Sequence, residues 1–328
     1  MLSRRIVFLW LALFTANLMA AEPSSLTLLK TIPLPGVTGR FDHFALDLTG
    51  QRLFVAALGN NSLEAIDLAA GQRITSISGL GKPTGVLFLP GLGRLFVACG
   101  DDGNMRVFGA KALNPVKMIP GLADADNARF DAKADLIYNG ISDGALAVIR
   151  ASTAEKIAEI KLAGHPESFQ LEQTGGRIYA NVPDAKHIAV IDREKREVVA
   201  TWPMEEFQAN FPMALDEQDH RLFIGCRNPA RLVVLDTVSG KKVTDLAISG
   251  DIDDLFFDGA RHRLYASCGE GFIDVIAQLD PDRYERSERI ASAPGARTAF
   301  FSPDRSEFYL AVPDRGVQKA EIRVYRVK

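Results

Sequence analysis

The sequence predicts an all-β protein, a seven-bladed β-propeller in which every blade is a four-stranded antiparallel sheet. Three observations predict this fold: a unit of nearly constant length recurs seven times, each copy contains short segments with the periodicity of β-strands, and the two chain ends supply complementary parts of one unit. The 328 residues are 47% hydrophobic and carry a formal net charge of −3, which is an ordinary globular composition.

The repeat is clearest at the second strand expected in each copy, as in "RLFVAAL", "RIYANV" and "RLFIGC". Matching positions in successive copies are 41 to 44 residues apart, at Leu53, Leu95, Leu136, Ile178, Leu222, Leu264 and Phe308. Units of this length, rich in short strands, are typical of propeller blades, where radial repetition leaves only short sheet edges.

Each copy is expected to contain four strands. In the first copy these are "FALDL", "RLFVAAL", "LEAIDL" and "RITSIS", separated by Gly, Asn and Asp. The last copy ends one strand short, whereas "SLTLLKTIPLPG" near the N-terminus matches the fourth strand of other copies, such as "EKIAEIKLAG". We therefore expect an N-terminal strand to complete the last blade and close the ring, so that residues 25–328 form one propeller domain.

The first 20 residues have the three-part pattern of a signal peptide. Met1–Arg5 is basic, Ile6–Phe14 is apolar but too short for a stable membrane span, and Leu18–Ala21 ends in small residues suited to cleavage. An uncleaved N-terminal anchor is the alternative interpretation. Cleavage predicts a periplasmic or secreted protein with no membrane span in its mature form, and we expect a monomer.

Three copies share a longer pattern: "IYANVPDAKHIAVIDREKREVVATWPM" (Ile178–Met204), "LFVAALGNNSLEAIDLAAGQRITSI" (Leu53–Ile77) and "LFIGCRNPARLVVLDTVSGKKVTDL" (Leu222–Leu246). This pattern resembles the YVTN-type, YncE-like family of exported seven-bladed propellers, although no copy has the full Y-V-T-N tetrad. The resemblance covers essentially all of the mature chain. It implies the fold and a role as a binding scaffold, but no chemistry, because the shared motifs are structural.

The three cysteines occur at equivalent strand ends, where other copies have alanine, glycine or valine. Cys99, Cys226 and Cys268 are therefore interpreted as small apolar residues. A disulfide between Cys226 and Cys268 remains an open alternative. No C-x-x-C spacing is present, so the sequence gives no indication of a thiolate metal site.

Polar residues precede or begin the first strand of every copy, and the fold places all of these segments at one mouth of the central channel. They are Arg40, Asp42, His43, Lys82, Asp126, Asn127, Arg129, His165, Glu167, Gln208, Asn210, Asp253, Asp254 and Arg297. Blade-end loops are polar in any propeller because their backbone is exposed. A mixture of imidazole, carboxylate, amide and guanidinium groups at one mouth nevertheless favours a ligand site.

The first functional hypothesis is a binding scaffold whose channel mouth holds a small polar or anionic molecule, or on which a protein partner docks. Arginine guanidinium groups bind carboxylates and phosphates through two hydrogen bonds, and lysine adds a positive charge. The expected ligand-binding residues are Arg40, Asp42, His43, Lys82, Arg129, His165, Glu167, Asp253 and Arg297. Nucleic acid is not expected as a partner, because the chain has no excess of basic residues.

The alternative hypothesis is an enzyme, a divalent-metal-dependent lactonase or related hydrolase. Gluconolactonase-like propellers hold one metal ion with Glu, Asn and Asp ligands, and the same residue types occur here at Glu167, Asn127, Asn210 and Asp254. His43 and His165 are the candidate general bases. A transition-metal or redox site shared by these two histidines is a weaker third hypothesis.

Overall fold

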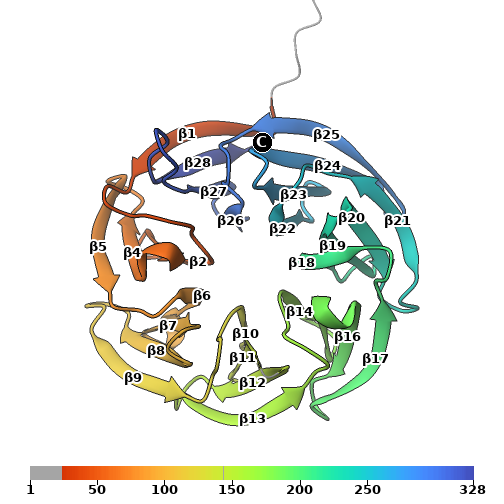
Figure 1. The fold of residues 1–328 in the computed structure, drawn as a ribbon, viewed down its shortest axis with the longest axis horizontal. Helices are drawn as coiled ribbons and strands as arrows, with labels where there is room; N and C mark the ends of the chain where they lie inside the picture. The colour runs from red at the N-terminus through yellow and green to blue at the C-terminus, as the bar shows by residue number, and fades with distance from the viewer. Residues whose placement is uncertain (1–23, 143) are drawn as a thin grey trace, which may run out of the picture.

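The computed structural model describes residues 24–142 and 144–328, so the predicted signal peptide (1–20) lies outside the described residues. The described residues form seven four-stranded sheets arranged as blades in a ring (Figure 1). The predicted seven-bladed propeller is confirmed. In six of the blades the four strands follow one another in the chain, with the first strand nearest the ring axis and the fourth at the rim (Figure 1).

The strands of blades 1 to 3 are β2 (Phe44–Asp47), β3 (Arg52–Ala57), β4 (Ser62–Asp67), β5 (Gln72–Ser78), β6 (Pro83–Leu89), β7 (Arg94–Cys99), β8 (Asn104–Gly109), β9 (Pro115–Pro120), β10 (Ala128–Asp131), β11 (Leu136–Ile141), β12 (Ala145–Arg150) and β13 (Glu155–Lys161). Those of blades 4 to 6 are β14 (Phe169–Leu171), β15 (Arg177–Val182), β16 (His187–Asp192), β17 (Glu197–Pro203), β18 (Gln208–Asp216), β19 (Arg221–Asn228), β20 (Ala230–Asp236), β21 (Lys242–Ala247), β22 (Ile252–Asp258), β23 (Arg263–Cys268), β24 (Phe272–Asp280) and β25 (Arg283–Ala291). Short 3-10 turns occur at η1 (Leu58–Asn60), η2 (Pro90–Leu92) and η3 (Pro183–Ala185). Over the described ranges, no helix reaches the length and hydrophobicity that crossing a membrane would require.

Blade 7 joins the two ends of the chain, as the sequence predicted. Its strands are β26 (Thr298–Ser302), β27 (Glu307–Val312), β28 (Glu321–Val327) and, outermost, β1 (Leu26–Pro33). Strand β1 runs antiparallel to β28, with Leu26 opposite Val327 and Pro33 opposite Glu321. The ring is therefore closed by backbone hydrogen bonds between the N-terminal and C-terminal strands.

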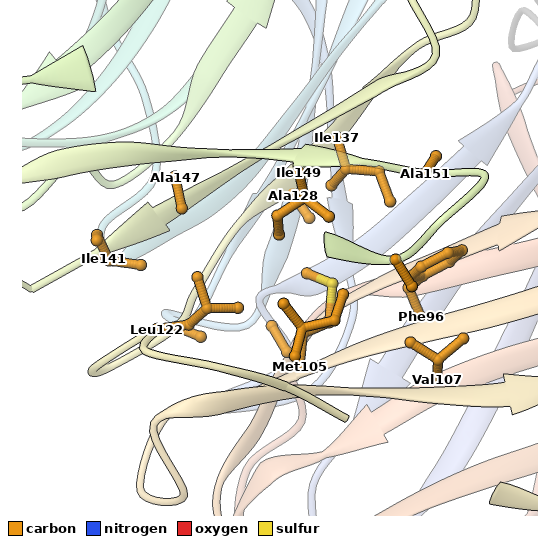
Figure 2. Close-up of a cluster of buried hydrophobic side chains, with 14 of the residues drawn as sticks. Phe96, Met105, Val107, Leu122, Ala128, Ile137, Ile141, Ala147, Ile149 and Ala151 are labelled. Carbon is orange, nitrogen blue, oxygen red and sulfur yellow. The ribbon is translucent and has the colours of Figure 1, made fainter. Parts of the chain in front are cut away.

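The hydrophobic core consists of clusters between neighbouring blades. Between blades 2 and 3, Phe96 and Met105 pack with Ile137 and Ile149, all with no exposed surface (Figure 2). Because each blade lies between two others, its middle strands are buried on both faces, as in β11, where every residue is buried. This two-sided burial explains why these strands are almost continuously apolar, whereas the rim strands are largely exposed.

All three cysteines are free and buried. Cys226 packs in the cluster between blades 4 and 5, whereas Cys268 packs in the cluster between blades 5 and 6, so the two thiols lie in different parts of the core. Burial raises the pKa of Cys99 and of Cys226 to about 12. The thiols therefore act as small apolar side chains, and the structure contains no Cys226–Cys268 disulfide.

A polar contact between blades 4 and 5 is centred on Glu217. Its carboxylate accepts hydrogen bonds from the backbone N–H groups of Gln173, Thr174 and Gly175, at 2.7–2.9 Å, and from the Thr174 hydroxyl. Burial opposes ionisation of Glu217, but these hydrogen bonds outweigh it and lower the pKa of the carboxyl to about 2. The ionised carboxylate therefore stabilises the contact between the two blades.

We expect Glu217→Gln to lower the free energy of unfolding by about 1–2 kcal/mol at pH 7, after allowance for solvent screening. Because the folded pKa lies below the unfolded value of about 4.3, the contribution is complete above pH 5 and disappears as the pH falls towards 2. Urea unfolding of both proteins between pH 2 and pH 7 measures the difference. Glu206→Gln, at an exposed position, serves as a control. If the difference in unfolding free energy between the wild type and Glu217→Gln does not change with pH, the ionised Glu217 carboxylate is not its cause.

Candidate functional site at the channel mouth

A cavity opens at the end of the ring where the chain enters the innermost strands, and all seven blades line it. Its outer part has a volume of about 250 Å³. The lining residues of the outer and inner parts are Arg40, Asp42, His43, Lys82, Thr84, Asp124, Asp126, Asn127, His165, Glu167, Ser168, Phe211, Arg227, Asp253, Asp254 and Thr298. The segments that the sequence assigned to one mouth therefore do converge there.

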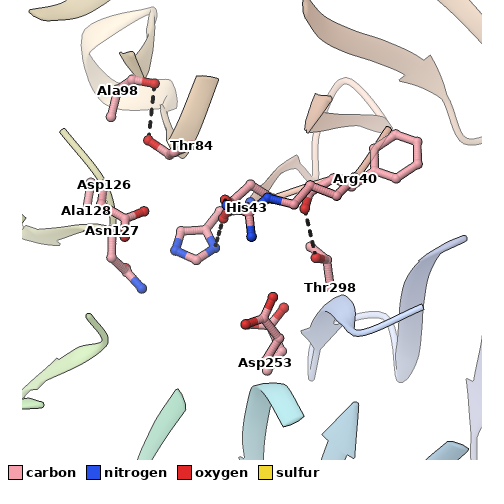
Figure 3. A network of polar contacts seen from close by, with 12 residues as sticks. Arg40, His43, Thr84, Ala98, Asp126, Asn127, Ala128, Asp253 and Thr298 are labelled. Atoms are coloured by element: carbon pink, nitrogen blue, oxygen red, sulfur yellow. Dashed lines mark hydrogen bonds and ion pairs between the residues drawn. The ribbon is translucent and has the colours of Figure 1, made fainter. Parts of the chain in front are cut away.

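Hydrogen bonds between neighbouring blades hold the segments that carry these side chains. The Thr298 hydroxyl of blade 7 donates to the Phe41 carbonyl at 3.1 Å, next to Asp42 (Figure 3). In blade 2, the Thr84 hydroxyl donates to the Ala125 carbonyl at 2.7 Å, next to Asp126. The positions of these two aspartates thus depend on the packing of adjacent blades.

Gly85 allows blade 2 to approach Asp126 closely. A Cβ atom at residue 85 would lie 2.3 Å from the backbone carbonyl oxygen of Asp126, which is far inside van der Waals contact. Only glycine therefore permits this separation of β6 from the segment before β10 without a backbone shift. The close approach fixes Asp126 between blades 2 and 3.

Two arginines at the mouth are bound to two aspartates. The Arg297 guanidinium lies 2.7 Å from Asp251 and 3.1 Å from Asp253, and Arg227 contacts the same two carboxylates. The guanidinium of Arg227 also lies 4.2 Å from the centre of the Phe211 ring, a cation–π contact. These four charges balance, so neither arginine is left as a free anion-binding group.

The other basic side chains of the mouth are also near carboxylates or engaged by the protein. Lys82 binds Asp124 at 2.8 Å. Arg40, which is half exposed, lies 3.8 Å from Asp42. Arg129 points deeper, where it donates to the side-chain oxygen of Asn127 and to a backbone carbonyl.

Two histidine–carboxylate groups line the cavity, with His43 in its inner part and His165 in its outer part, and Asp126 belongs to both groups. His43 Nδ1 lies 3.1 Å from Asp42 Oδ1 (Figure 3), and His165 Nε2 lies 3.6 Å from Asp126 Oδ2. One ring nitrogen or carboxylate oxygen from each of Asp42, His43 and Asp126 lies within 4.8 Å of the other two, and the same holds for Asp126, His165 and Glu167. His43 Nε2 and His165 Nδ1 are buried and have no hydrogen-bond partner among the described residues.

The crowding of carboxylates perturbs their ionisation. Burial, followed by the charge of Asp126, raises the pKa of Glu167 to about 7. The same two causes hold the pKa of Asp42 well above its usual range, and burial also raises that of Asp254. Burial lowers the pKa of His43 to about 4, so at neutral pH its ring is uncharged and offers a lone pair.

The four residues expected to bind a metal ion through oxygen do not form one set. Asn127, Glu167 and Asp254 line the inner cavity, but Asn210 is absent from its lining and is fully buried in blade 5, where its amide donates to Asn181 Oδ1 at 3.0 Å. A β-bulge between Asn210 and Met213 shifts the register there. Blade 5 instead presents Phe211 to the cavity.

Three residues important for the geometry were not selected from the sequence. Asp126, Arg227 and Phe211 line the mouth, and the sequence showed only that Asp126 and Arg227 occur in segments on the correct face. Arg297 and Arg129 were selected, but Arg297 binds Asp251 and Asp253, and Arg129 lines the deeper channel. The strand periodicity of the sequence cannot distinguish a mouth residue that faces solvent from one that faces the cavity, because both lie in loops.

Beyond the polar mouth the channel becomes apolar. A cavity of about 340 Å³ shares His43 and Asp254 with the mouth and is otherwise lined mainly by side chains such as Phe44, Phe256 and Phe300. Arg129 and Asp254 are the charged side chains of this deeper part, so most of the carboxylates lie at the mouth. A polar ligand that enters from this end meets the histidines and carboxylates first.

No family model matches the sequence, and no curated protein is similar to it in sequence. Solved structures are similar in fold. A chain in a crystal structure of a mitotic checkpoint complex is 13% identical with a TM-score of 0.79, over 99% of each chain. A chain of hydrazine synthase from Kuenenia stuttgartiensis is 15% identical with a TM-score of 0.74, over 85% of this chain and 95% of that one. At these identities the similarity shows the propeller fold alone.

Proposed function

We propose that this protein is an exported propeller of the YVTN type that acts as a binding scaffold for a small, positively charged ligand at the channel mouth. The observation that carries the proposal is the pairing of the basic side chains. Arg227, Arg297 and Lys82 are bound to aspartates, whereas Asp126 and Glu167 have no salt bridge to lysine or arginine among the described residues, and the basic group nearest Asp126 is His165, at 3.6 Å. A ligand that supplies positive charge relieves the repulsion between these carboxylates.

Of the ligands expected from the sequence, a small polar or anionic molecule or a protein partner, the anion fits this cavity least. An anion would have to displace Asp251 and Asp253 from the two arginines and approach the other carboxylates of the cavity. Both steps cost electrostatic free energy, because charges are poorly screened in a partly buried site. A cation meets neither obstacle.

The export and family parts of the proposal rest on the sequence. The basic, apolar and small-residue segments of residues 1–20 support a cleaved signal peptide, and the repeated third-strand and fourth-strand patterns support the YVTN type. Chemical sequencing of the N-terminus of protein recovered from the periplasm or medium of a producing cell tests export. Retention of the native N-terminus in the membrane would identify the anchor instead.

Ligand charge is tested with the full mature chain and two small probes, spermidine as a cation and citrate as an anion. We expect spermidine to raise the melting temperature and citrate to leave it unchanged, because only a ligand that binds the native state stabilises it. At pH 8, above the pKa of about 7 of Glu167, Glu167→Gln should weaken spermidine binding at least about tenfold, since it removes a negative charge at the site. The exposed Glu285→Gln is the matched control and should bind like the wild type.

Two results would contradict the proposal. Stabilisation by citrate but not by spermidine would show that the arginines do accept an anion, as the sequence suggested. Turnover of a lactone by the metal-loaded protein would assign the hydrolase alternative, in which the same cavity is catalytic.

A further inference from the structure

We propose that the channel mouth contains a binding site for one divalent transition-metal ion, with Asp126, His165 and Glu167 as its protein ligands. The inference deepens the proposed function and rests on it, because it identifies the positively charged ligand of the cavity as a metal ion. It differs from the oxygen-only set considered from the sequence, since Asn210 does not line the cavity and an imidazole takes part.

The charged groups at the channel mouth balance one another only in part. The groups Arg227, Arg297, Asp251 and Asp253 form a neutral network, and Lys82 with Asp124 forms a neutral pair. After this pairing, the carboxylates that point into the cavity with no salt bridge to lysine or arginine include Asp126 and Glu167. A single divalent cation neutralises both, whereas a monovalent one leaves residual repulsion.

The distance between the His165 and Asp126 side chains fits two ligands of one metal ion. His165 Nε2 and Asp126 Oδ2 are 3.6 Å apart, which is longer than a good hydrogen bond. It is close to the separation of roughly 3.3–3.5 Å between two ligand atoms that each lie about 2.0–2.1 Å from a tetrahedral metal ion. One possible ligand atom from each of Asp126, His165 and Glu167 lies within 4.8 Å of the other two, so small side-chain rotations bring all three onto one ion.

His43 also lies near Asp126, and its surroundings suit a metal ion at this place. Its Nδ1 is held by the Asp42 carboxylate, which leaves Nε2 buried with no partner among the described residues. A carboxylate commonly orients the imidazole of a metal-binding histidine in this way, and here it fixes the ring of His43 with Nε2 free. His43 Nε2 is therefore placed to accept a hydrogen bond from a water molecule on the ion.

The donor atoms select the class of metal. One imidazole nitrogen with two carboxylates suits Zn²⁺, Mn²⁺ or Fe²⁺, whereas Ca²⁺ requires six to eight oxygen ligands, and Mg²⁺ keeps most of its water. The three ligands come from the segments before β10 and β14, which adjacent blades hold in place. The site is thus largely organised before an ion arrives.

The test measures Zn²⁺ binding to the full mature chain, freed of metal with a chelator, by calorimetry and by native mass spectrometry. We expect one ion per chain, and Ca²⁺ at the same concentration should not compete. His165→Ala and Asp126→Asn should each weaken Zn²⁺ binding at least about 100-fold. His187→Ala is the matched control, because His187 begins β16 and does not line the cavity, and it should bind Zn²⁺ like the wild type.

The outcomes separate this inference from the proposed function. If the wild type does not bind Zn²⁺ while spermidine still binds at the mouth, the metal site is wrong and the cationic ligand stands. If Asp126→Asn binds Zn²⁺ as tightly as the wild type, the ion lies elsewhere and the inference is overturned. Spermidine binding should survive His165→Ala, and a melting curve for each variant confirms that it is folded.

Discussion

Replacing Ile32 with alanine is expected to lower the free energy of unfolding by about 2–5 kcal/mol. Ile32 lies on β1 with no exposed surface and packs in the cluster between blades 7 and 1, beside Tyr309 and Ile322. The substitution removes buried methyl groups and leaves a cavity at the point where the ring closes. Strand β1 joins the N-terminal end of the chain to the three C-terminal strands of blade 7. The loss of packing at Ile32 therefore weakens the closure of the whole ring.

The control for this substitution is on the same strand. Leu28 is 49% exposed, so Leu28→Ala should change the free energy of unfolding by no more than about 0.5 kcal/mol. Denaturant unfolding followed by circular dichroism gives both values. Equal effects of the two substitutions would show that β1 is not packed as the fourth strand of blade 7.

Replacing Gly85 with alanine is expected to destabilise the protein by about 1–3 kcal/mol and to disturb the channel mouth as well. The new Cβ atom would lie 2.3 Å from the Asp126 carbonyl oxygen, so β6 and the segment before β10 must move apart. This displacement moves Asp126, and both spermidine and Zn²⁺ binding should weaken. Thermal unfolding and calorimetry measure the two effects separately.

Gly91 of η2, in the same blade, provides the comparison. A Cβ atom there would meet no heavy atom within 4 Å, so Gly91→Ala should be neutral or stabilise the protein by up to about 1 kcal/mol. Ligand binding should not change in this variant. If Gly85→Ala behaves in the same way, the close approach of blade 2 to Asp126 is not needed for the site.

The fold could be predicted because its signal is local and repeated. Each copy contains strand-forming segments such as "RLFVAAL", and a regular spacing of such segments is compatible with few architectures. The closure by "SLTLLKTIPLPG" was also readable, because the last copy lacks one strand and this segment supplies it. The expected interpretation of the cysteines as small apolar residues agrees with their burial in the core.

The site was only partly predictable. The sequence placed His43, His165 and Glu167 on the correct face, but it assigned Arg297 to a ligand, whereas the structure shows that Asp251 and Asp253 bind it. It also selected Asn210, which a β-bulge turns into the core of blade 5. Pairings between loops of different blades depend on distances that no repeat period encodes.

By itself the sequence determined the number of blades, the strand that closes the ring and the face on which polar residues gather, because all three follow from the order of local segments along the chain. The tertiary structure alone decided which of those polar residues remain free. Ion pairs form between residues far apart in the sequence, such as Arg227 with Asp253, 26 residues apart, and Arg297 with Asp251, 46 residues apart. Only after these pairs are known does the charge left at Asp126 and Glu167 become apparent, and with it the preference for a cation.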